Sequence, residues 1–77
     1  MKLYKATYES RNFSFSCLDQ TKEQALAGLH EGLDIHANQY GLAADWWRRF
    51  ENDLNVVEML VGVCYRDYSP IQEVDHA

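Results

Sequence analysis

Two stretches near the start of the chain alternate between apolar and polar positions with a period of two, which is typical of β-strands. The first stretch would place Tyr4, Ala6 and Tyr8 on one face, with Leu3, Lys5 and Thr7 on the other. The second stretch follows polar residues 9–12, and its apolar face consists of Phe13, Phe15 and Cys17. Because the polar interval is short, the two strands are predicted to form a β-hairpin.

A long helix is predicted to begin at Thr21, because Thr21 and Gln24 have the spacing of a capping box. Projected at 100° per residue, the apolar residues that follow form one stripe about 120° wide, the width expected of a helix packed on a sheet. The stripe consists of Ala25, Leu26, Leu29, Leu33, His36, Ala37 and Tyr40. Gly41 stands where a C-terminal cap is expected. Gly28 and Gly32 lie beside the stripe, where they either permit a close backbone approach to the sheet or to another chain, or are tolerated.

The rest of the chain predicts a short second helix over about 43–51 and a long strand over 54–65. The resulting order, β-β-α-α-β, predicts an α+β fold with a three-stranded antiparallel sheet and one long helix packed on one face. A helix that crosses between the second and third strands would return the last strand beside the first, which gives the strand order 2-1-3. The chain is too short for a second core, so residues 1–77 are expected to form a single domain, with about 70–77 as a flexible tail.

The predicted core follows from the faces of these elements. It comprises Tyr4, Ala6, Phe13, Phe15, Leu26, Leu29, Leu33, Val57, Met59, Val61 and Val63. The second face of the sheet is expected to stay open and partly apolar, with Leu3, Val56 and Leu60 on it. A thin core gains from burying more apolar area, so self-association into a homodimer through this face or through the last strand is a further expectation.

Composition and charge narrow the classes of function. Apolar residues make up 47% of the chain, well above the level of disordered chains. Seven Lys and Arg against twelve Asp and Glu give a net charge of −5, which weighs against general binding to nucleic acid or to anionic membranes. No apolar run approaches the roughly 18 residues of a membrane span, and residues 1–5 show no signal peptide, so a cytoplasmic location is expected.

The residues that could carry chemistry do not form a recognisable motif. The sequence has no Gly-rich phosphate loop and no nucleophile–base signature, so neither an enzymatic activity nor a cofactor is predicted. His30 and His36 lie about 120° apart around the predicted helix and are not expected to share a metal ion. Cys17 and Cys64 lack metal or redox spacing and are expected to be buried, reduced thiols.

Two features favour a protein partner. Acidic residues on the helix and elsewhere would oppose a basic, nucleic-acid-reading surface, although an acidic helix face is also the ordinary solvated face of a helix. The open side of the sheet, together with Tyr65 and Tyr68, offers apolar and aromatic residues that are typical interface anchors, although it could instead be the poorly covered sheet of a small domain. The predicted partner-binding residues are Glu23, Glu31, Asp34, Trp46, Trp47, Tyr65, Asp67 and Tyr68.

The doublet Arg48 and Arg49, next to Trp46 and Trp47, supports a different function. Aromatic rings and arginines together are what sites for single-stranded nucleic acid use, because bases stack on the rings and the arginines hold phosphate. A small nucleic-acid-binding or regulatory domain is therefore the alternative function. The same residues have a structural interpretation, in which the tryptophans cap the core and the arginines are solvated partners of Glu51 and Asp53.

Four tracts of the sequence, 2–8, 36–42, 44–47 and 60–67, resemble small acidic accessory proteins that phages and plasmids carry, anti-CRISPR proteins among them. The resemblance implies a protein located in the host bacterial cytoplasm that binds and blocks a nucleic-acid-handling complex. The expected function is thus a non-enzymatic inhibitor that acts by steric and electrostatic occlusion of a protein effector.

Overall fold

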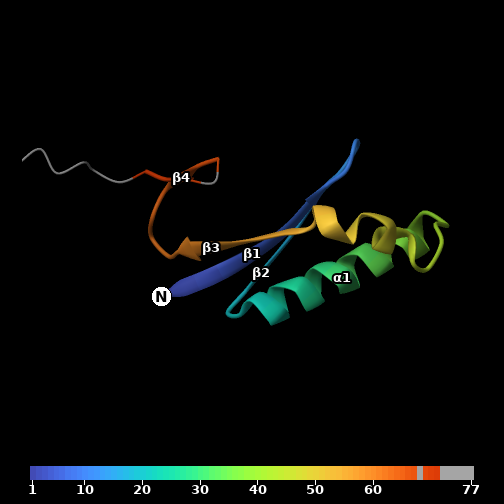
Figure 1. Cartoon of the computed structure of the whole chain (residues 1–77), viewed down its shortest axis with the longest axis horizontal. Helices are drawn as coiled ribbons and strands as arrows, with labels where there is room; N and C mark the ends of the chain where they lie inside the picture. The colour runs from blue at the N-terminus through green and yellow to red at the C-terminus, as the bar shows by residue number, and fades with distance from the viewer. Residues whose placement is uncertain (68, 72–77) are drawn as a thin grey trace, which may run out of the picture.

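Three antiparallel strands form a sheet in the order β2-β1-β3 (Figure 1). They are β1 (Lys2–Glu9), β2 (Ser14–Asp19) and β3 (Asn55–Leu60). The structure is a computed structural model that describes residues 1–67 and 69–71. It confirms the predicted α+β class, the antiparallel sheet and the strand order. The β1–β2 hairpin is also confirmed, and the Ser10 N–H closes it by donating to the Phe13 carbonyl at 2.8 Å.

The long helix α1 (Lys22–Gln39) begins and ends as the sequence predicts. The Thr21 hydroxyl accepts from the Gln24 N–H at 3.1 Å and so satisfies one of the free amides of the first turn. At the other end Gly41 has a φ of +66°, in the left-handed region. There the Leu42 N–H donates to the Ala37 carbonyl at 2.8 Å, which is the long bond of a Schellman motif.

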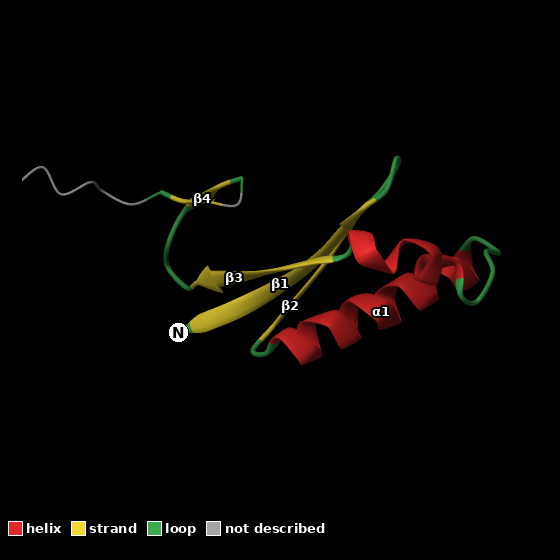
Figure 2. Cartoon of the chain, viewed as in Figure 1, coloured by secondary structure: helices red, strands yellow, loops and turns green. Residues whose placement is uncertain are grey.

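Helix α1 and the 3-10 helix η1 (Trp46–Asp53) lie on the same side of the sheet, as Figure 2 shows. Helix α1 packs mainly against β2 and β1 and touches β3 much less. The buried core between the layers consists of Ala6, Ala25, Leu29, Leu33 and Trp47. The predicted apolar stripe of α1 is therefore its packing face, except that Tyr40, at its end, is exposed.

Gly28 shows why the helix can lie so close to β2. A Cβ added at Gly28 would overlap the Sγ atom of Cys17, which occupies the space beside the helix backbone. A Cβ added at Gly32 would meet nothing within 4 Å. Of the two interpretations offered for these glycines, close approach to the sheet thus applies to Gly28, and nothing in the described chain requires Gly32.

The last strand differs from its prediction in length and in orientation. Strand β3 ends at Leu60 because the chain turns at Gly62, whose φ is +84°. Val56 pairs with Ala6 and Glu58 with Tyr4, so Val56, Glu58 and Leu60 share the helix-facing side of the sheet. Val57 and Met59 face the opposite side, beside Lys5 and Leu3. The prediction had assigned these two sets of residues to the wrong faces.

The predicted core needs further corrections beyond β3. Phe13 is 42% exposed and Val61 is 53% exposed, because both lie past the ends of their strands. Val63 also lies outside any strand and is half-buried. Conversely, Trp47 belongs to the core although the prediction omitted it. Cys64 is exposed rather than buried, while Cys17 is half-buried against the helix.

A short hairpin follows the sheet, formed by β4 (Tyr65–Arg66) and β5 (Ser69–Pro70). The Ile71 N–H donates to the Cys64 carbonyl at 2.7 Å and extends this pairing by one bond. Pro70 and Ile71, which were assigned to a flexible tail, are therefore part of an ordered hairpin. The remainder of that predicted tail, 72–77, lies outside the described residues.

Candidate functional site

The predicted acidic surface of α1 contains residues of two kinds. Glu23 and Glu31 are exposed on the side of the helix that faces away from the sheet. Asp34 instead accepts a hydrogen bond from the indole Nε1–H of Trp47 at 2.6 Å. Its carboxylate therefore holds the second helix against the first, and only the two glutamates are carboxylates without such a structural task.

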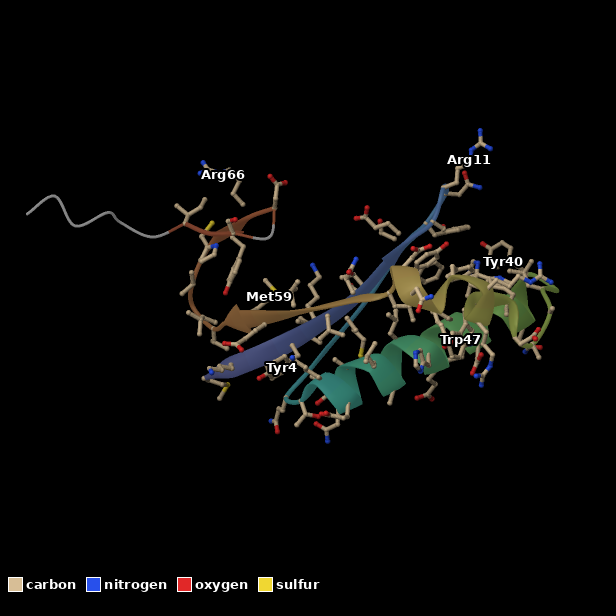
Figure 3. The ribbon with its side chains drawn as sticks, in the orientation of Figure 1. Tyr4, Arg11, Tyr40, Trp47, Met59 and Arg66 are labelled. Atoms are coloured by element: carbon tan, nitrogen blue, oxygen red, sulfur yellow. The ribbon has the colours of Figure 1, made fainter. Side chains whose placement is uncertain are left out.

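Trp47 is a structural residue rather than an exposed anchor. Its side chain is 5% exposed, and its ring stacks on the His30 ring with centroids 4.2 Å apart. The guanidinium of Arg48 lies 4.8 Å from the centroid of the Trp47 ring, whose position is seen in Figure 3. The ring is thus occupied by neighbours from its own chain.

Trp46 is half-buried in an aromatic cluster where α1, η1 and the β1–β2 hairpin meet. Its ring lies edge-on to those of Phe15, His36 and Phe50. His36 is enclosed further by Phe13 and Tyr40. This cluster accounts for Trp46 through packing, as the capping interpretation of the tryptophans predicts.

The side of the sheet away from the helices carries an uncovered row of apolar residues, which we call the open face: Leu3, Leu18, Val57 and Met59. Figure 3 shows the contrast, with Met59 on this side and Tyr4 directed toward α1. Leu18 is 56% exposed, and the other three are half-buried. Lys5 stands among them on β1. Polar residues interrupt this row and continue it along the same face: Lys5, Thr7, Ser16 and Asn55.

The β4–β5 hairpin bounds the open face at one end. The Tyr65 hydroxyl accepts from the Leu60 N–H at 2.8 Å, which ties the hairpin to the last residue of β3. A cavity of about 30 Å³ lies between hairpin and sheet, lined by Lys5, Val57, Glu58, Met59, Tyr65 and Asp67. Small-molecule sites usually enclose roughly 300 Å³ or more, so this cavity is too small for a substrate.

A second, shallower cleft lies beside the C-terminal half of α1. It measures about 270 Å³ and is lined by Asp34, Ala37, Asn38, Leu42 and Ala44. Among the described residues that line it, Asp34 is the only charged one, and it is engaged with Trp47. The cleft therefore lacks the converging free polar groups that would orient a ligand.

The structure separates the predicted partner-binding residues into three places. Asp34, Trp46 and Trp47 belong to the packing between the helices, whereas Glu23 and Glu31 lie on the outer surface of α1. Tyr65 and Asp67 border the open face, and Tyr68 lies outside the described residues. Sequence reasoning did not assign Lys5, Leu18, Val57 or Met59 to this site. The signal that could have found them is the second apolar row of the sheet, Leu3 with Val57 and Met59.

Comparisons with protein families, with curated proteins and with solved structures found no match for this chain. Within residues 1–67 and 69–71, neither helix combines the length and the apolar character that crossing a bilayer requires. In the same ranges, no three His, Cys, Asp or Glu side chains come together in a way that could hold a metal ion.

Proposed function

We propose that this protein is a non-enzymatic, protein-binding inhibitor of the anti-CRISPR type, from a mobile genetic element, which blocks a nucleic-acid-handling host defence complex. The observation that carries the proposal is the open face, which lies on the side of the sheet away from both helices, with Leu18 exposed and with Val57 and Met59 half-buried beside the β4–β5 hairpin. An apolar surface rimmed by polar residues is what a protein interface requires.

Charge supports the choice of a nucleic-acid-handling partner. The chain has a net charge of −5, and Glu23 and Glu31 are exposed on the opposite side of the molecule from the open face. An inhibitor bound through the open face would present these carboxylates outward, where they repel phosphate from the occluded surface. Steric and electrostatic occlusion then act together, with apolar contacts supplying affinity and charge excluding the nucleic acid.

The geometry of the tryptophans weighs against the alternative, a nucleic-acid-binding domain built on Arg48 and Arg49. A base can stack only on an exposed ring. Trp47 is buried, and Trp46 is packed among aromatic neighbours. Arg48 and Arg49 are both exposed, but the ring against which Arg48 lies is that of the buried Trp47, which offers a base no free face.

The proposal is tested by capturing partners from a bacterial lysate with the tagged chain, with and without nuclease treatment. We expect a protein complex that survives nuclease and that is lost from the double variant Val57→Lys/Met59→Lys on the open face. Gln39→Lys, an exposed residue at the end of α1, is the matched control for added charge and should retain the complex. The proposal would be contradicted if the chain bound naked DNA or RNA tightly and if the double variant Arg48→Ala/Arg49→Ala abolished that binding.

Stoichiometry separates an inhibitor from an enzyme. In a nucleic-acid cleavage assay with the captured complex, inhibition should saturate at about one chain per complex and reverse on dilution. The charge-reversal pair Glu23→Lys/Glu31→Lys should bind the complex but inhibit it less, because occlusion of phosphate depends on these carboxylates. Inactivation of many complexes by one chain would show catalysis. Asp34 is unsuited to this test because its loss would also release Trp47.

A further inference from the structure

Strand β3 has one side that no strand of the described chain covers, because it lies at the edge of the sheet. The pairing with β1 determines which of its backbone groups point outward. The Val61 N–H donates to the Met1 carbonyl, in register with the pairs Leu3–Met59 and Lys5–Val57. Backbone groups alternate along a strand, so the odd-numbered residues bond inward to β1 and the even-numbered ones point outward.

The outward residues are therefore Val56, Glu58 and Leu60. The contact between the Leu60 N–H and the Tyr65 hydroxyl agrees with this assignment, since the hydroxyl reaches Leu60 from the hairpin and not from β1. Tyr65 thus occupies one edge donor at the end of the strand. The amides and carbonyls of Val56 and Glu58 carry no bond to a strand within the described residues.

We propose that the outer edge of β3 binds an extended segment of the partner protein as a fourth strand, with a Lys or Arg of that segment beside Glu58. This inference rests on the proposed function and specifies how the partner binds. Strand addition supplies main-chain hydrogen bonds for affinity and alternate side chains for specificity. On the open-face side, the added strand would extend the apolar row of Val57 and Met59.

The charge around β3 favours a basic segment of the partner protein. The stretch 51–67, which contains β3 and the residues on both sides of it, has one cation, Arg66, and the following carboxylates: Glu51, Asp53, Glu58 and Asp67. Glu58 lies at the centre of the edge, and its side chain is half exposed. The Nζ atom of Lys2, on the neighbouring strand β1, lies 3.4 Å from its Oε1 atom. A segment that alternates basic and apolar residues is complementary on both sides of the sheet.

The same charges disfavour a second copy of this chain as the occupant. Two β3 edges can pair antiparallel in two registers of equal overlap, which place the two Glu58 side chains on the same face either directly opposite each other or as diagonal neighbours. Like charges directly opposite each other across two strands are destabilising. A basic segment replaces this repulsion with attraction, so a partner strand is favoured over self-pairing.

The test uses a synthetic seven-residue probe of alternating Lys and Val, compared with a peptide of alternating Glu and Val. Titrated into isotope-labelled protein, the Lys–Val probe should shift the amide resonances of Val56 and Glu58 and slow their hydrogen exchange, whereas the Leu60 amide is already bonded to Tyr65. The Glu–Val peptide should bind at least fivefold more weakly. Shifts confined to the outer face of α1, around Glu23 and Glu31, would overturn the proposal.

Two proline variants locate the binding edge. Glu58→Pro removes an outward N–H and keeps the inward bonds of β3, so it should abolish binding of the Lys–Val probe. Ser16→Pro is the matched control, because Ser16 points outward on the opposite edge, on β2, and binding should be unchanged. Glu58→Gln, which keeps the backbone N–H and removes the charge, should lower the affinity for the Lys–Val probe about threefold. If Glu58→Pro does not fold, the chain made with an N-methylated Glu58 amide serves in its place.

The outcomes distinguish this inference from the proposed function. If Glu58→Pro binds the probe as the unchanged protein does, strand addition is wrong, whatever the lysate yields. If β3 resonances shift with protein concentration in the absence of probe, self-pairing occupies the edge and the inference is equally wrong. If the probe binds at β3 while no nuclease-resistant complex is captured from the lysate, the result supports the strand-addition site and contradicts the proposed inhibitor function.

Discussion

The two sides of one strand, β1, show how differently this small domain treats its two sheet faces. Ala6 on the helix-facing side is fully buried beneath α1, with Tyr4 and Tyr8 packed around it. On the other side, Leu3 and Lys5 are half-buried, and both helices of the described residues lie on the opposite side of the sheet (Figure 2). One helix of 18 residues can cover only one face of a sheet. The covered face therefore provides stability, and the open face is available for a partner.

The largest expected effect tests whether stability depends on the covered face. Leu33 on α1 is 0% exposed, and Leu33→Ala should destabilise the fold by about 3 kcal/mol through lost burial and a residual cavity. The same truncation on the open face, Leu18→Ala, should cost about 0.5 kcal/mol or less. Urea unfolding followed by circular dichroism measures both. Equal losses would show that the open face is covered in solution.

The second prediction contrasts the two glycines of α1. Gly28→Ala should destabilise by about 2 kcal/mol because the new methyl group overlaps Cys17 Sγ. Gly32→Ala should stabilise by about 0.5 to 1 kcal/mol, because the methyl group meets nothing and alanine favours the helix. Thermal unfolding of each variant gives the signs. The double variant Gly28→Ala/Cys17→Ala should recover part of the loss, and additive losses would show that the two residues do not interact.

The helix–sheet layer was largely predictable from the sequence, because strong periodic signals define it. Thr21 and Gly41 mark the ends of α1, and its apolar stripe determines the packing face. The faces of β3 were not predictable in the same way. Val56, Val57, Met59 and Leu60 are apolar on both sides, so alternation alone leaves two assignments. Pairing with β1 decides between them, and Glu58 can face the helix side because α1 scarcely reaches beneath β3.

A third, smaller effect concerns the helix-to-helix bond on the covered side. Asp34→Ala removes the acceptor of the Trp47 indole N–H and should destabilise by about 1.5 kcal/mol. Glu31→Ala, one turn earlier on the same helix and exposed, is the control and should change stability by less than about 0.5 kcal/mol. Chemical unfolding monitored by tryptophan fluorescence suits both variants. Similar values for the two would mean that the bond contributes little in solution.

The smallest effect is expected at the boundary of the open face. Tyr65→Phe removes the hydroxyl that accepts from the Leu60 N–H, so stability should fall by only about 0.5 kcal/mol. The exchange of the Leu60 amide hydrogen with solvent should nevertheless accelerate severalfold, while that of Met59, bonded to β1, stays unchanged. Amide exchange followed by NMR resolves the two residues. An unchanged Leu60 rate would show that the hairpin does not protect this edge.

The site itself was less predictable than the fold. Tyr65 and Asp67 were expected to bind a partner and do border the open face, but Trp47 and Asp34 are bonded to each other. The sequence alone does not distinguish an aromatic residue that is exposed at an interface from one that is buried in the core, because the same residue types occur at both. The bond between indole and carboxylate joins residues 13 positions apart, a relationship that no local periodicity encodes.

The close contact between Gly28 and Cys17 also makes the two thiols of this chain chemically unequal. Cys64 is exposed, so an alkylating reagent should reach it without any movement of the protein. The sulfur of Cys17 occupies the space that a Cβ at position 28 would need, and Cys17 is half-buried against the helix. Alkylation of Cys17 should therefore be slower than that of Cys64 and should accelerate when α1 opens away from the sheet. The chain thus carries both a reporter of helix opening and an internal reference for it.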